Sequence, residues 1–179
     1  MLAATHPALV RKLILVSSGP FEERFTASIV ATRLARLEDG ERREFQSALQ
    51  TLSDKVARDK GMVFATLGRL TAKADAFDAL QREHTNTTKL RPDIYEAIWP
   101  EAAELRASGK LLMLGSQIQC PVVAIHGDHD PHPAAGVEEP LGRLLREFRF
   151  VLLRNCGHHP WLERQTKAEF FGVLRQELA

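Results

Sequence analysis

The 179-residue chain is predicted to be an α/β protein in which a small parallel sheet is interrupted by a long helical insertion. Three short, mostly apolar segments, at residues 13–16, 121–125 and 148–153, are typical of buried parallel strands. Residues 21–110, between the first two segments, show apolar residues only at helical spacing. The expected architecture is therefore a three-stranded parallel sheet with flanking helices and an inserted helical subdomain.

The chain begins with residues typical of the end of a helix. Leu2-Ala3-Ala4 is followed by His6-Pro7, and the residue before a proline is pushed out of the helical region. The apolar run from Leu13 to Val16 is the first predicted strand, and Ser17-Ser18-Gly19-Pro20 ends it. We assign residues 1–20 to the start of the α/β core.

The insertion, residues 21–110, is interpreted as a helical lid. Breaks between its helices are predicted at Asp39-Gly40, Gly61 and Asn86-Thr87-Thr88. Trp99-Pro100 is predicted to break or kink the last helix, because proline removes a helical hydrogen bond. The aromatic residues of this region are expected to form lid core or to line an apolar pocket: Phe64, Phe77 and Trp99, together with Trp161.

Residues 111–179 return to an α/β pattern. The strand at 121–125 is followed by a predicted helix at 137–147, the strand at 148–153 and a final helix at 163–178. We assign this region to the α/β core as well.

Acidic and imidazole groups follow two of the predicted strands. The second strand runs into His126-Gly127-Asp128-His129-Asp130-Pro131, and the third into Asn155-Cys156-Gly157-His158-His159-Pro160. In an open α/β sheet the loops at the carboxyl ends of the strands form the ligand crevice. An Asp and a His there match two members of a Ser-His-Asp relay, in which the acid orients the imidazole.

These motifs resemble the C-terminal portion of a lid-bearing member of the α/β-hydrolase superfamily. The first strand resembles the one after the nucleophile elbow, residues 121–131 resemble the acid-bearing strand and turn, and residues 157–163 resemble the histidine loop. The resemblance implies that Asp130 is the triad acid and His158 the general base. It implies a small ester, amide or related substrate, and no cofactor or metal.

The nucleophile of that family is missing from the chain. By the resemblance, the G-x-S-x-G elbow would lie several residues before Met1, and the isolated chain is expected to be a poor hydrolase. Ser17, Ser18 and Ser116 end or precede strands without the glycine-flanked turn that exposes a catalytic hydroxyl, so strand-end packing or capping is favoured for them. The alternative is a non-catalytic truncated remnant or protein-interaction module.

Other polar residues of the two motifs have simpler interpretations. Asp128 is favoured as a turn residue, His126 as a polar residue near the site and His159 as loop packing. The histidines and aspartates also permit a metal site, although H-x-D-H-D-x-H lacks the spacing that places two ligands on one helical face. Cys156 is interpreted as a structural thiol rather than a reactive one.

The composition excludes several partners. A formal net charge of +1 without a basic block argues against nucleic acid. No leader peptide or long apolar run appears, which argues against a membrane partner and predicts a cytoplasmic location. The exposed edge of the strand at 13–16 predicts a homodimer, or aggregation, through that edge.

Overall fold

The computed structural model describes residues 1–54, 60–80 and 92–179. Three parallel strands form one sheet in the order β1-β2-β3. The strands are β1 (Leu13–Val16), β2 (Val122–Gly127) and β3 (Phe148–Leu153). The predicted fold class is confirmed, and β2 extends two residues beyond its predicted end.

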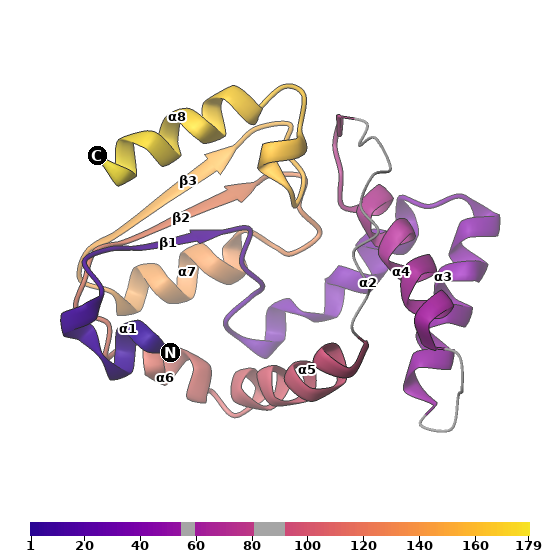
Figure 1. Cartoon of the computed structure of the whole chain (residues 1–179), viewed down its shortest axis with the longest axis horizontal. Coiled ribbons are helices and arrows are strands. Elements are labelled where there is room, and N and C mark those ends of the chain that lie inside the picture. The colour runs from indigo at the N-terminus through magenta and orange to yellow at the C-terminus, as the bar shows by residue number, and fades with distance from the viewer. Residues whose placement is uncertain (55–59, 81–91) are drawn as a thin grey trace.

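The helices lie on both faces of the sheet and beyond its carboxyl edge. In Figure 1, α8 covers one face and α7 the other, while α2, α3 and α4 lie beyond the arrowheads of the strands. Their bounds are α1 (Leu2–Thr5), α2 (Ala27–Ala35), α3 (Asp39–Ser53), α4 (Lys60–Ala74), α5 (Pro92–Ala107), α6 (Lys110–Gly115), α7 (Ala135–Leu144) and α8 (Lys167–Leu178). Short 3₁₀ turns occupy η1 (Pro7–Leu9), η2 (Glu23–Phe25) and η3 (Pro160–Leu162).

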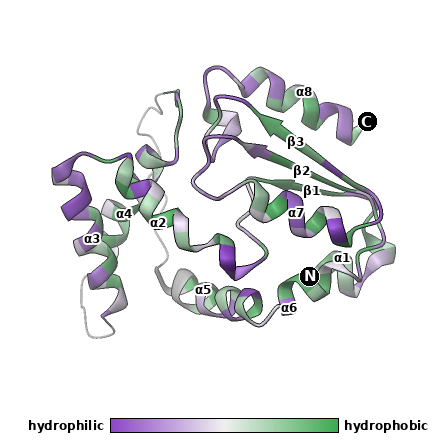
Figure 2. Ribbon diagram, turned by 180° about the vertical axis from the view of Figure 1, so that it is seen from behind, coloured by the Kyte–Doolittle hydropathy of each residue, from purple (hydrophilic) through white to green (hydrophobic). Residues whose placement is uncertain are grey.

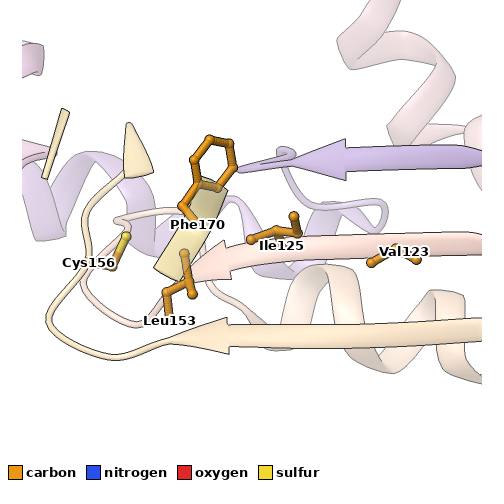
Figure 3. Packing of buried hydrophobic residues seen from close by; sticks show 5 residues of the cluster. All are labelled: Val123, Ile125, Leu153, Cys156 and Phe170. Carbon is orange, nitrogen blue, oxygen red and sulfur yellow. The ribbon is translucent and has the colours of Figure 1, made fainter. Parts of the chain in front are cut away.

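The sheet is the centre of the apolar core. Figure 2 shows the three strands mostly in the green of hydrophobic residues, whereas α8 carries both colours. On the α8 face a buried cluster joins β2 and β3 to α8. Figure 3 shows its members: Val123, Ile125, Leu153, Cys156 and Phe170. On the α7 face Ala124 packs against Val137 and Leu141. Because both faces are covered, the central strand β2 is buried along its whole length.

The insertion has a core of its own. Leu37, Phe45, Leu70 and Ala74 form a buried cluster contributed by α3, α4 and the turn after α2. Helix α3 begins at the predicted break, with a capping box between Glu38 and Glu41. The division into residues 1–20, 21–110 and 111–179 remains a proposal.

Expectations about the later part of the insertion were wrong in part. Helix α4 begins at Lys60, beside the break predicted at Gly61, but α5 continues through Pro100. Trp99 is 58% exposed, so it belongs neither to a core nor to a closed pocket. The predicted break at 86–88 lies outside the described residues.

The last helix also differs from its prediction, since α8 begins at Lys167 rather than at 163. Glu163 is buried there, and its carboxylate accepts backbone N–H groups from two other segments. Within the described ranges, no helix has the length and apolar character that crossing a membrane requires.

Candidate active site

The turn after β2 places Asp130 beside the loop that follows β3. The N–H of Asp128 donates to the carbonyl of Leu153, and the N–H of His129 donates to the carbonyl of Cys156. Both bonds continue the parallel pairing beyond the last paired residues, Gly127 and Leu153. The loops at the ends of β2 and β3 therefore stay in register.

Gly127 is required by this close approach. A Cβ atom at this position would lie 2.2 Å from the carbonyl oxygen of Cys156 and 2.6 Å from that of Gly157. Backbone atoms cannot yield as a flexible side chain can. The absence of a side chain at Gly127 thus lets the histidine loop lie directly against the end of β2.

Asp130 and His158 are brought together as the sequence predicts. The Oδ2 atom of Asp130 and the Nδ1 atom of His158 are 2.7 Å apart. The carboxylate of Asp130 is fully buried, whereas the side chain of His158 is 25% exposed. This leaves a shielded acid behind an imidazole that solvent or a ligand can reach.

The other carboxylate oxygen of Asp130 is held by His132. Oδ1 accepts the backbone N–H of His132 at 2.9 Å and lies 2.8 Å from its Nδ1 atom. The rings of His132 and His158 are 4.7 Å apart and tilted by 36°. The carboxylate therefore links two imidazoles, a role for His132 that the sequence analysis did not assign.

The charge of Asp130 is set by two opposing effects. Burial raises its pKa, but the hydrogen bonds with His132 and His158 and the charges of nearby imidazoles lower it, so that the pKa lies well below its ordinary value. The carboxylate is therefore ionised at neutral pH and accepts hydrogen bonds only. Nδ1 of His158 is then the donor, and in the neutral ring Nε2 keeps a lone pair available to accept a proton.

His126 lies behind the carboxylate. Its Nε2 atom is 2.8 Å from the carbonyl of His132 and 3.6 Å from Oδ2 of Asp130, while its buried Nδ1 atom has no hydrogen-bond partner among the residues that the structure describes. Burial lowers the pKa of His126, and the charge of Asp130 acts in the opposite sense. His126 thus stands at the site, as expected, without facing its open side.

Three other residues singled out in the sequence lie around the Asp130–His158 pair. Oδ1 of Asp128 is 3.3 Å from the backbone N of Cys156, so Asp128 fastens the histidine loop as well as forming the turn. His159 packs edge-to-face between His158 and Trp161. Burial raises the pKa of the Cys156 thiol to about 11, which agrees with a structural role.

Of the three serines, Ser17 has an unusual position. It follows β1 with φ +48°, and its buried hydroxyl has no hydrogen-bond partner among the described residues. A left-handed conformation at a residue other than glycine costs free energy. Ser116, by contrast, caps a turn through its hydroxyl, which donates to the carbonyl of Met113.

The side chains around the Asp130–His158 pair are also close enough together to bind a metal ion. Asp130, His132 and His158 each offer a ligand atom, and these atoms lie within 4.8 Å of one another. Two imidazoles and a carboxylate suit zinc or iron. Both Nδ1 atoms already form hydrogen bonds with the carboxylate, so these groups are satisfied without an ion. The expectation of no metal stays a prediction.

Comparisons with known proteins bear on this arrangement. No protein-family model matches the chain. Among solved structures, proline iminopeptidase of Mycobacterium smegmatis matches 99% of this chain with a TM-score of 0.55 and 18% identity. Est816, an N-acyl homoserine lactone degrading enzyme, matches 98% of it with a TM-score of 0.52 and 19% identity. These likenesses show a shared fold.

One known protein is also similar to this chain in sequence. Pimeloyl-[acyl-carrier protein] methyl ester esterase of Nitrosomonas europaea is 31% identical over 169 residues, or 90% of this chain. The chain is a relative of the α/β-hydrolases. It spans 60% of the length of that esterase and 59% of the mycobacterial peptidase. The three-stranded sheet and its helices are thus part of an α/β-hydrolase fold.

Proposed function

We propose that this polypeptide forms the acid and base portion of a hydrolase that cleaves a small ester, amide or related substrate. The observation that carries the proposal is the contact of the buried carboxylate of Asp130 with Nδ1 of the partly exposed His158. The esterase of Nitrosomonas europaea supports an ester as the first substrate class to test. No cofactor or metal is part of the proposal.

In the proposed reaction His158 is the general base. With Nδ1 donating to Asp130, its Nε2 atom accepts the proton of a nucleophilic hydroxyl as that hydroxyl attacks the carbonyl carbon. The ring then carries a positive charge, which the ionised Asp130 stabilises at 2.7 Å. As the tetrahedral intermediate collapses, Nε2 gives this proton to the leaving group, which departs and leaves the acyl group bonded to the nucleophile. In the second half, Nε2 takes a proton from a water molecule that attacks the acyl carbon, and it returns that proton to the oxygen of the nucleophile as the acid product leaves.

The nucleophile is proposed to come from outside these 179 residues. No G-x-S-x-G sequence occurs in the chain. The helical insertion, residues 21–110, is proposed to be the lid, since α2, α3 and α4 lie beyond the carboxyl edge of the sheet (Figure 1). A cytoplasmic location is also proposed, supported by the free thiols of Cys120 and Cys156.

The test uses the protein purified from its own source. Its intact mass is measured, and it is treated with a fluorophosphonate, which labels activated serines, and with p-nitrophenyl butyrate as an ester. We expect labelling at a serine outside residues 1–179, and ester hydrolysis that His158→Gln lowers by roughly 10³-fold or more. The exposed His6→Gln is the matched control and should retain full activity.

A different result would favour the alternative, a non-catalytic interaction module. A native mass of 20.0 kDa, no labelling and no hydrolysis of any acyl substrate would contradict the proposed hydrolase.

A further inference from the structure

The segment after α4, residues 75–80, lies directly against the histidine loop, residues 157–163. Figure 1 shows this segment rising from α4 toward the loop between β3 and α8. The carbonyl of Asp75 accepts the backbone N–H of His158 at 2.8 Å. The N–H of Leu80 donates to the carbonyl of Leu162 at 2.7 Å, and an isolated antiparallel bridge pairs Ala79 with Glu163. The insertion is thus hydrogen-bonded to the backbone of the base itself.

A buried carboxylate completes this contact. Glu163 is 1% exposed, and its Oε1 atom accepts the N–H groups of Phe77 and Gly157, both at 3.0 Å. Its Oε2 atom accepts the N–H of Asp78 at 2.7 Å. Burial of a carboxylate is costly unless hydrogen bonds satisfy it. Here one carboxylate satisfies N–H groups from both segments at once.

A second buried carboxylate ties the same segment to α2. Both oxygens of Asp75 accept hydrogen bonds from Arg33, from Nε and Nη2, each at 2.7 Å. Asp75 is 1% exposed, and the side chain of Arg33 is 17% exposed. Arg36, one turn later, donates to the carbonyl of Ala74. A planar guanidinium held at both oxygens fixes the direction of the carboxylate.

The packing of segment 75–80 against the histidine loop leaves no room for a side chain next to His158. A Cβ atom on Gly157 would lie 2.1 Å from the carbonyl oxygen of Asp75 and 2.5 Å from Oε1 of Glu163. The residue directly before His158 is therefore enclosed by both carboxylate-bearing residues. A displacement of segment 75–80 would change the position of His158.

We propose that Asp75 and Glu163 are positioning residues that couple the helical insertion to His158. Arg33 fixes the orientation of Asp75 through two hydrogen bonds. Asp75 and Glu163 then fix the backbone of residues 157 and 158 by accepting their N–H groups. The insertion then controls the Asp130–His158 hydrogen bond as well as covering the site. The inference rests on the proposed function for its catalytic meaning, but its geometry is tested without turnover.

The test is nuclear magnetic resonance on the 179-residue chain with ¹⁵N-labelled histidine. Within the described part of the chain, Arg33 forms hydrogen bonds with Asp75 and none with the histidine loop, so it acts on that loop through Asp75. In Arg33→Gln we expect the low-field signal of the Nδ1 proton of His158 to lose intensity. We also expect the backbone amide hydrogen of His158 to exchange with solvent at least about tenfold faster. Amides of β2 should keep their wild-type exchange rates. Arg69→Gln, which removes an exposed ion pair with Glu44 in the same insertion, is the matched control.

Two further variants protect the test from simple unfolding. Arg33→Lys retains the charge but loses the double hydrogen bond, and it should give the same local effect in a weaker form. Glu163→Gln keeps one oxygen but places an NH₂ group against backbone donors, and it should loosen Gly157 and His158 together.

Two results would overturn the inference. One is a His158 signal and amide rate unchanged in every folded variant. The other is an acceleration equal in β2 and at His158, which would assign the carboxylates a general structural role. Because neither readout needs ester hydrolysis, failure of the proposed activity would leave this result intact.

Discussion

The Oδ2 atom of Asp130 lies 2.7 Å from the Nδ1 atom of His158, although 28 residues separate them in the chain. The two residues follow neighbouring parallel strands, and the last residues of β2 and β3 are paired with each other. Strands that end at the same level deliver their next residues to the same edge. Sheet register therefore brings the acid and the imidazole to the same edge of the sheet.

Replacing Asp130 by Asn should lower stability in a pH-dependent way. The folded-state pKa of Asp130 is depressed below 3.8, so its ionised form stabilises the fold above that pH and loses this effect as the pH falls further. At pH 7 we expect Asp130→Asn to cost about 1–3 kcal/mol, because donors from His132 and His158 lose an acceptor. Urea unfolding followed by circular dichroism measures the difference.

The control for this variant is Asp39→Asn, whose exposed carboxylate forms an ion pair with Arg42. It should change the free energy of unfolding by less than about 0.5 kcal/mol. A difference between wild type and Asp130→Asn that stays constant from pH 7 to pH 3 would contradict the assigned charge state.

Gly127→Ala should disturb the histidine loop. The added methyl group would have to displace the carbonyls of Cys156 and Gly157, and forced overpacking costs about 1–3 kcal/mol. Gly142→Ala in α7 is the matched change, since its Cβ would meet Phe148 at an ordinary 3.8 Å. That variant should be neutral or stabilising. Equal melting temperatures for the two variants would refute the close-approach argument.

Ser17→Gly should stabilise the protein. It relieves a φ of +48° and removes a buried hydroxyl that has no partner in the described part of the chain. The gain expected is about 1 kcal/mol, the cost of a left-handed conformation for a residue with a Cβ. Ser18→Gly, which lacks the positive φ, should give no gain in the same thermal unfolding experiment. A loss of stability in Ser17→Gly would point to a role for the hydroxyl.

The buried His126 should make the fold acid-sensitive. Burial lowers its folded-state pKa below 6.5, so between pH 6.5 and that lowered pKa the unfolded chain binds more protons, and the free energy of unfolding decreases as the pH falls. His126→Gln should flatten the decline in unfolding free energy between pH 7 and pH 5, whereas the exposed His6→Gln should not. Identical pH slopes for wild type and His126→Gln would rule this out.

The edge of β1 gives a prediction about association. The N–H groups of Leu13 and Ser17 bond to the β2 side, so strand alternation directs that of Ile14 outward, where no described strand pairs with it. We expect concentration-dependent dimers in sedimentation velocity. Ile14→Pro removes the outward donor without touching the β1–β2 bonds and should shift the protein to monomer. A wild-type protein that stays monomeric at every concentration would contradict the prediction.

The sequence predicted the elements that have a local apolar pattern, although only β2 is buried along its whole length. All three strands were predicted from their apolar runs. The resemblance singled out Asp130 and His158, and their places after neighbouring strands predicted their contact; their catalytic roles stay a prediction. The apolar runs are local signals, because a buried parallel strand is apolar on both faces wherever it stands in the fold.

The parts that the sequence did not predict depend on distant partners. Glu163 reads as the first turn of a helix, yet it serves as the acceptor for residues more than 80 positions earlier. Asp75 is an ordinary acid after a helix until Arg33 is placed beside it. Likewise Pro100 is tolerated within α5, although its missing N–H predicted a break. No local pattern encodes such pairings.

The chain order of the strands also bears on how the protein folds. Only α7 and two short loops separate β2 from β3, whereas residues 17–121 separate β1 from β2. The entropy lost on closing a loop grows with its length, so the β2–α7–β3 unit should form first and β1 should join late. Asp130 and His158 would then be brought together within this strand-helix-strand unit before the insertion docks on it. Refolding would bring the two chemical groups together early and the segment that aligns them last.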